Sequence, residues 1–259
     1  MQIGIDVGAT KIESVVLEED GNEKHRSRTD CPKDYLSIIS TIKDIHRNLE
    51  KEFQKELPIG VCHPGIHSPQ TGLVKNAPNC YWLEKKPFQS DLRKALGKEV
   101  FCENDGNCFA LSEAIDGAGK HYKIVYGIIL GSGAGGGLVI DKQIVSGPNG
   151  VAGEWGHNQI PYFAAKKENF NSNNAREAEV ESFISGLGIA KRFNKLYRKN
   201  LKTNEIFELN RKHDLDAERF IDEFKLNLAM SLSVIINILD PDAFVFGGVV
   251  SNEIDFLSE

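Results

Sequence analysis

Hydrophobic and polar residues alternate at the start of the chain and again near its middle. Residues 2–7 and 12–17 are rich in β-formers and flank a turn at 8–11, so they predict a hairpin. Residues 123–130 and 136–140 flank a glycine-rich turn in the same way. Helical and further strand patterns follow each hairpin. The two halves are therefore predicted to be related α/β units.

Helical spacing dominates two longer stretches. Apolar residues recur every three or four positions over 34–56, and an apolar stripe from Phe220 to Leu239 ends before Pro241. The Asn-rich stretch 162–180 is polar and predicts a solvated, mobile loop. Shorter patterns predict strands at 57–62, 98–102 and 243–246, and helices at 92–96, 107–114 and from Glu181 to a break near Ser185.

Composition narrows the class of protein. The 259 residues are 41% hydrophobic and 26% charged, with a formal net charge of −6, which suits a globular protein and disfavours nucleic acid or anionic membrane as a partner. No apolar run approaches the ~20 residues of a membrane-spanning helix, and the first residues lack the pattern of a secretory signal. The five cysteines are unclustered, so we expect reduced thiols in a cytoplasmic protein.

The first turn carries groups suited to phosphate binding. A small residue in a tight hairpin lets backbone N–H groups approach phosphate oxygens, and a hydroxyl and a cation follow it. Asp6, at the end of the preceding strand, could hold Mg²⁺ through water molecules. On these residues alone a plain hairpin turn is the stronger alternative. The candidate residues are Asp6, Gly8, Ala9, Thr10 and Lys11.

Two later glycine segments point the same way. Gly131, Ser132 and Gly133 begin a run of five glycines in seven residues, which is typical of phosphate cradles and is not a linker, because it lies between two β-rich runs. Gly247 and Gly248 follow a buried-type strand, where a ligand could face the backbone. A tight strand-to-helix turn would explain this second pair equally well.

Polar groups that could act on a sugar lie in two places. Asn104 and Asp105 come between a strand and a helix, and a carboxylate there can accept a proton from a hydroxyl; a turn or helix cap is the alternative. Glu154 and His157 lie among glycines and could bridge sugar hydroxyls, although a loop with a packed tryptophan would look alike.

Taken in order, these segments resemble the ROK family (repressors, open reading frames and kinases) over essentially the whole chain. The resemblance rests on IGIDVGATKIE, HPGIHSPQTGLVKNAPNCYWL, ENDGNCFALSEA, GSGAGGGLVI, NGVAGEWGHN, VESFISG and NILDPDAFVFGGVVSN. It implies an α/β, actin-like ATPase (ribonuclease H-like) fold with two α/β domains and an interdomain cleft. We place the domains at 1–115 and 116–259, the second of them apparently truncated, because the family continues for several tens of residues.

The resemblance also implies a role for each candidate. Asp105 matches the catalytic aspartate, and Asn104, Asp105, Glu154, His157 and Glu181 match the sugar contacts. The first turn and Gly131–Gly133 match the two phosphate segments, and Gly247 and Gly248 the adenosine segment. The implied cofactors are ATP and Mg²⁺. The implied partner is a hexose. A homodimer is compatible with the family. We do not expect a DNA-binding repressor.

The implied activity is transfer of the γ-phosphoryl group of ATP to the C6 hydroxyl of a hexose. The finer similarity favours fructose, hence a fructokinase. Glucose or an N-acetylhexosamine is the nearest alternative substrate, and a degenerate protein that only binds sugar is the alternative of another class.

Two departures from the family pattern affect these expectations. Many members bind zinc through the histidine that matches His157 and three cysteines. The positions expected for those cysteines hold Ser172, Asn174 and Glu179, so we predict that structural zinc is absent. Ala9 stands where a glycine is usual, which would matter if the backbone there needs a positive φ.

Overall fold

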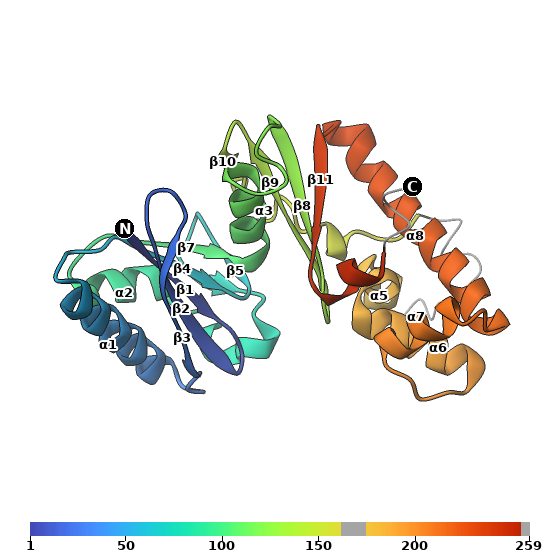
Figure 1. Cartoon of the computed structure of the whole chain (residues 1–259), viewed down its shortest axis with the longest axis horizontal. Coiled ribbons are helices and arrows are strands. Elements are labelled where there is room, and N and C mark those ends of the chain that lie inside the picture. Colours follow the sequence, from blue (N-terminus) through green and yellow to red (C-terminus); the bar gives the residue numbers. More distant parts are fainter. Residues whose placement is uncertain (162–174, 255–259) are drawn as a thin grey trace. The chain divides into compact units, whose positions relative to one another are not determined.

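The computed structural model describes residues 1–161 and 175–254, as two compact units (Figure 1). Unit 1 comprises Met1–Cys108 and Ser146–Val151, and unit 2 comprises Phe109–Val145 and Ala152–Glu259. Most of the loop predicted at 162–180 lies outside the described residues. Among the described helices, none has the length and hydrophobicity needed to cross a bilayer.

Unit 1 contains a five-stranded sheet in the order β3-β2-β1-β4-β7. Strands β1 and β2 pair antiparallel, as the hairpin pattern predicts. Strand β3, which the pattern did not predict, pairs antiparallel with β2, whereas β4 and β7 run parallel to β1. The carboxyl ends of β1, β4 and β7 therefore meet at one edge of the sheet, where α/β proteins bind ligands. The strands are β1 (Gln2–Val7), β2 (Lys11–Leu17), β3 (Glu23–Asp30), β4 (Ile59–His63) and β7 (Val100–Asn104).

Helix α1 confirms the helical spacing of its segment. Its side chains Ile38, Ile42 and Leu49 are buried in the same core as the sheet, and the Asp34 carboxylate caps it by accepting the Ser37 N–H at 2.9 Å. The bounds of this helix and of the shorter elements of unit 1 are α1 (Tyr35–Phe53), α2 (Phe88–Leu96), η1 (Pro78–Leu83), β5 (Ile66–His67) and β6 (Val74–Lys75).

Helix α3 (Asp105–Ile115) begins directly after β7 and belongs to both units. Its first turn groups with unit 1, and the residues from Phe109 group with unit 2. The reason is close packing on β8, because a Cβ at Gly127 would lie 2.7 Å from the Ala110 Cβ. The domain division at residue 115 that the sequence suggested thus falls at the far end of this helix.

Unit 2 contains a four-stranded sheet in the order β10-β9-β8-β11. The hairpin β8–β9 is antiparallel and β11 runs parallel to β8, as β4 does to β1 in unit 1. Each unit thus joins a hairpin with a short turn to a parallel strand, as the sequence pattern predicts. The strands are β8 (Ile124–Leu130), β9 (Ala134–Ile140), β10 (Gln143–Ile144) and β11 (Ala243–Gly247).

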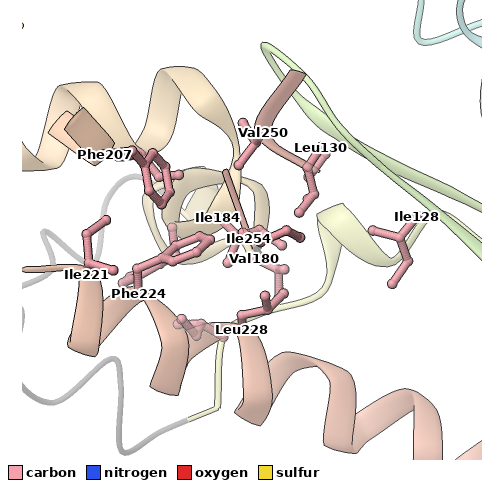
Figure 2. Packing of buried hydrophobic residues seen from close by; sticks show 14 of the residues in the cluster. Ile128, Leu130, Val180, Ile184, Phe207, Ile221, Phe224, Leu228, Val250 and Ile254 are labelled. Atoms are coloured by element: carbon pink, nitrogen blue, oxygen red, sulfur yellow. The ribbon is translucent and has the colours of Figure 1, made fainter. Parts of the chain in front are cut away.

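Helices α5, α6, α7 and α8 of unit 2 pack around one apolar core (Figure 2). Phe224 of α8 meets Phe207 of α7 edge to face, with ring centroids 5.8 Å apart, and Ile184 and Val250 pack in the same cluster. This core fixes the helices that follow the glycine turn of β8–β9. The helical elements are η2 (Trp155–His157), η3 (Ala175–Ala178), α5 (Glu181–Ile184), α6 (Gly186–Tyr197), α7 (Thr203–Arg211), α8 (Leu215–Leu239) and η4 (Val249–Glu253).

Candidate functional site

The carboxyl edge of the sheet in unit 1 gathers the predicted polar residues of that unit. Asp6 is the penultimate residue of β1, Asn104 ends β7, and Asp105 begins α3. Asp6 pairs in register with Cys62 of β4, and Cys62 pairs with Glu103 of β7. Parallel pairing thus brings together residues that lie about a hundred positions apart in the sequence.

Asp6 and Asp105 are both exposed carboxylates, and Asp105 is close enough to affect the pKa of Asp6. The pKa of Asp6 is raised because neighbouring atoms partly desolvate the carboxylate and because Asp105 repels its charge, while a hydrogen bond from the Cys62 thiol partly lowers it. A divalent cation would relieve this repulsion. Two exposed carboxylates therefore fit Mg²⁺, which takes few protein ligands and keeps several water molecules.

Asn104 caps helix α3. Its Oδ1 accepts the backbone N–H of Asn107 at 2.8 Å, and the side chain is only 5% exposed. Asp105 Oδ1 accepts the N–H of Gly106 at 2.9 Å, which leaves the carboxylate exposed at the start of the helix. The cap predicted at Asp105 or Asn107 is therefore supplied by Asn104 instead. A cap at this edge and a role toward a ligand are compatible, because both need the side chain fixed.

The first turn, between β1 and β2, is closed by the N–H of Gly8, which donates to the Lys11 carbonyl at 2.9 Å. Ala9 has no positive φ, so the alanine is not strained there. Thr10 is exposed, and its carbonyl accepts the N–H of Cys31 at 2.9 Å. The Lys11 ammonium forms an ion pair with Asp30 of β3 rather than with Asp6. The turn is therefore open to a phosphate, but Lys11 would have to leave Asp30 to reach it.

The second turn, between β8 and β9, is supported by Glu181 of α5. The carboxylate accepts the N–H of Ala134 at 2.8 Å and lies 2.5 Å from the position of a Cβ at Gly133. At the other side of the turn, the Gly131 carbonyl accepts the N–H of Gly186 at 2.8 Å. Glu181, which the resemblance matches to a sugar contact, is thus joined to the turn that is predicted to bind phosphate.

A cavity of about 470 Å³ begins at this second turn. It has the size of a small-ligand pocket and combines an apolar wall with a few polar groups. Its lining includes Gly131, Ser132, Leu187, Thr203, Asn204 and Val249. A larger cavity of about 610 Å³ shares Ser132 and Leu187, and basic side chains line it, among them Lys191, Lys195 and Arg198.

The two glycines predicted to bind adenosine, Gly247 at the end of β11 and Gly248 after it, do not line this cavity themselves. Gly248 has φ +85°, and a Cβ there would lie 2.5 Å from the Leu130 carbonyl oxygen, so only glycine fits. A Cβ at Gly247 would lie 2.6 Å from the Phe109 ring. The next residues, Val249 and Val250, do line the cavity. The segment predicted to bind adenosine therefore reaches the cavity with Val249 and Val250, and not with the predicted pair of glycines.

Glu154 and His157 lie together around η2, which packs tightly on β9. The Trp155 indole donates to the Gly135 carbonyl at 3.0 Å, and a Cβ at Gly156 would lie 2.0 Å from the Ala134 carbonyl oxygen. His157 is exposed, and its Nδ1 lies 3.2 Å from Glu179 Oε2. Glu179 is one of the positions where the family pattern expects a cysteine.

Metal-ligating side chains do not cluster in the described residues. Over 1–161 and 175–254, no three His, Cys, Asp or Glu side chains gather in a way that could hold an ion. Ser172 and Asn174 lie outside the described residues, so the predicted absence of structural zinc stays a prediction. A Mg²⁺ ion bound mainly through phosphates and water needs no such group of three.

Sequence reasoning missed several residues of these sites. Thr203 and Asn204 begin α7, and Lys202 precedes it; all three line the smaller cavity, but no motif marked them. Glu103 and Glu179 accept hydrogen bonds from predicted site residues or their neighbours. Glu103 lies inside the quoted segment ENDGNC, so its place directly before Asn104 was the available signal.

Known proteins resemble this chain over its whole length. The sequence model described as "ROK family" matches residues 2–259. N-acetyl-D-glucosamine kinases from Histophilus somni (strain 129Pt) and Haemophilus influenzae (strain 86-028NP) are each 36% identical to it over 266 residues, and each match covers 100% of this chain and 87% of the relative.

Solved structures agree on the fold. A ROK hexokinase from Thermus thermophilus has a TM-score of 0.85 at 24% identity, covering 97% of this chain and 82% of its own. A ROK family glucokinase from Streptomyces griseus, solved with glucose and AMPPNP, has a TM-score of 0.74 at 26% identity, covering 97% and 84%. The predicted α/β, actin-like ATPase fold is confirmed.

Proposed function

Because the chain belongs to the ROK family, we propose that it is an ATP-dependent sugar kinase whose substrate is an N-acetylhexosamine, N-acetyl-D-glucosamine first. Sugar kinases of this family use ATP with Mg²⁺, as the sequence predicts. The reaction transfers the γ-phosphoryl group to the C6 hydroxyl of the sugar.

The choice of sugar corrects the first expectation from the sequence, which favoured fructose. The curated relatives that match at 31–36% identity are named N-acetyl-D-glucosamine kinases. Sugar specificity depends on a few hydroxyl or amide contacts, which short motifs shared across a family do not report. The N-acetylhexosamine alternative is therefore the better-supported substrate class.

Asp105 is the proposed general base. Its carboxylate is exposed at the start of α3, and the hydrogen bond from Gly106 fixes one oxygen while the other can accept a proton from a hydroxyl. Asn104, buried beside it as the helix cap, would orient the sugar. In phosphoryl transfer the transition state is loose, so positioning of the hydroxyl and neutralisation of charge carry most of the catalysis.

Each unit offers a turn that could contact the phosphates of ATP. In unit 2 the turn at Gly131–Gly133 would contact phosphates, and the cavity lined by Leu187, Asn204 and Val249 would take the adenosine. In unit 1 the turn at Gly8–Thr10 would contact phosphates, and Asp6 would hold Mg²⁺, which supplies positive charge against the polyphosphate. Glu154, His157 and Glu181 are the further sugar contacts that the family resemblance suggests.

One observation supports this function most. An exposed aspartate at the start of α3 lies near a second exposed carboxylate at the end of β1, in a chain 36% identical to N-acetyl-D-glucosamine kinases along its whole length. A base and a magnesium ligand are the two carboxylates that the chemistry requires.

A sugar panel tests the proposal. Purified protein is assayed for ADP release with ATP–Mg²⁺ and N-acetyl-D-glucosamine, N-acetyl-D-mannosamine, glucose or fructose. We expect the highest kcat/KM with N-acetyl-D-glucosamine. A preference for fructose or glucose would refute the substrate class. Sugar binding by calorimetry without turnover of any sugar would refute the kinase and favour the degenerate sugar-binding protein.

A further inference from the structure

Glu103, the penultimate residue of β7, accepts hydrogen bonds from three different groups. Its Oε1 accepts the backbone N–H of Asn104 at 2.9 Å and the side-chain amide of Asn107 at 3.1 Å. Its Oε2 accepts the Ser146 hydroxyl at 3.3 Å. A half-buried carboxylate with donors on both oxygens is fixed in place.

Together with the cap of α3, these contacts form a closed ring of hydrogen bonds that includes Asn104. Glu103 binds Asn104 through its N–H, Asn104 binds Asn107 through the helix cap, and the side chain of Asn107 returns to Glu103. Asp105 lies between Asn104 and Asn107 in the sequence, so this ring holds the segment that contains it. Among the described residues, its carboxylate is hydrogen-bonded only to the adjacent N–H of Gly106. The backbone on either side of Asp105 is therefore held by these hydrogen bonds.

The second oxygen of Glu103 joins this ring to another segment of unit 1. Residues 146–151 pack on β5, where a Cβ at Gly150 would lie 2.7 Å from the His67 carbonyl oxygen, and Asn149 accepts a hydrogen bond from Gln70 at 3.0 Å. The same segment leads directly to Glu154. Glu103 thus connects the start of α3 to the chain that precedes the proposed sugar loop.

We infer that Glu103 is a positioning residue, which orients Asn104 and Asp105 toward the sugar and takes no part in proton transfer itself. The inference rests on the proposed function. Each oxygen of Glu103 already accepts from an amide or a hydroxyl, so it is poorly placed to serve as a base. The nearby imidazoles of His63 and His67 have lowered pKa values, because burial disfavours their charged forms, so they do not offer Glu103 a proton.

Three variants at this position separate positioning from other roles. Glu103→Gln retains an acceptor for Asn104 and Asn107, and its amide can donate to Ser146, so we expect a kcat within about three-fold of wild type. Glu103→Ala removes every contact. Misplacing a reacting group by about 1 Å can cost ~10²-fold, so we expect kcat to fall ~10–100-fold and the KM for sugar to rise ~10-fold, with the KM for ATP unchanged. Glu103→Met keeps the volume without acceptors and should match alanine.

Glu99→Ala is the matched control. Glu99 directly precedes β7, pairs with Arg93 and is 72% exposed, so its removal should leave both constants within two-fold. Wild-type activity in both Glu103→Ala and Glu103→Met would overturn the inference. A Glu103→Gln variant as inactive as Glu103→Ala would also overturn it, because the negative charge of Glu103 would then take part in the chemistry. If Glu103→Ala loses activity only in proportion to a lowered Tm, with equal effects on the KM values for sugar and ATP, then Glu103 has only a structural role and the inference is wrong.

The wild-type protein separates this test from that of the function. Absence of turnover by wild type with any sugar refutes the proposed kinase, whatever the variants do. Turnover by wild type together with an unaffected Glu103→Ala variant refutes only the positioning role. Calorimetric sugar binding provides a second readout, in which Glu103→Ala should bind ~10-fold more weakly and Glu103→Gln should bind like wild type.

Discussion

Replacing Gly133 with alanine places a methyl group against the carboxylate that supports the second glycine turn. The new Cβ would lie 2.5 Å from Glu181 Oε2, whereas the backbone of Gly133 has no positive φ and tolerates alanine. Glu181 must therefore move and give up its hydrogen bond to the Ala134 N–H. A hydrogen bond to a charged group contributes about 1.5–3 kcal/mol, and since Glu181 is only half-buried we expect a loss of about 1–2 kcal/mol.

That loss corresponds to a fall in Tm of roughly 2–8 °C for a protein of this size, measured by differential scanning calorimetry. Because the turn would also lose its shape, the KM for ATP should rise several-fold while the KM for sugar changes less. Gly135→Ala is the control, because a Cβ there meets nothing within 4 Å. In a Glu181→Ala background the Gly133 substitution should cost little, since the clash is gone. An equal cost in both backgrounds would refute the reasoning.

Two further predictions concern the contact between His157 and Glu179 and the carboxylate of Asp6. His157→Ala and Glu179→Ala should each raise the KM for sugar ~5–30-fold, and the double variant should be no worse than His157→Ala; additive effects would show that Glu179 does not act through the 3.2 Å contact. Asp6→Asn should raise the Tm of the ligand-free protein at pH 7. Because the pKa of Asp6 is raised, its ionised carboxylate lowers the stability of the folded protein at pH values above its ordinary pKa of 3.8. This cost disappears as the pH falls below that value, so the gain in Tm of the variant should vanish in acid. The same variant should lose the stabilisation that ATP–Mg²⁺ gives to wild type; an unchanged ligand-induced Tm shift would exclude Asp6 as a magnesium ligand.

Elements with one buried face could be predicted from the sequence, and elements without one could not. The spacing of Ile38, Ile42 and Leu49 identified α1, and the two hairpins were placed to within two residues. Strand β3, with the sequence EKHRSRTD, was missed because it is the edge strand of its sheet and every residue but one is exposed. Its charges pair with β2, as Arg28 does with Glu13, so nothing in its pattern reports a core.

The sequence could identify candidate site residues that lie in a local motif. It could not identify residues that reach the site only through contacts with distant parts of the chain. Motif order identified Asn104, Asp105 and the second glycine turn as candidates, and their roles stay predictions. Glu181 was matched to the sugar, yet its carboxylate reaches the N–H of Ala134, a contact 47 positions away that no local pattern encodes. Asn204 was missed for a related reason. It lines the cavity because α7 packs beside Gly186, and tertiary packing alone brings these segments together.

The variant Asp105→Asn shows whether Asp105 removes the proton from the sugar hydroxyl. Asparagine retains the Oδ1 that accepts the Gly106 N–H at 2.9 Å, so the helix start should keep its shape while the base is lost. Single-turnover phosphorylation of N-acetyl-D-glucosamine should slow by ~10²–10⁴, with the calorimetric Kd for the sugar within a few-fold of wild type. Phosphoryl transfer at the wild-type rate in this variant would contradict the account.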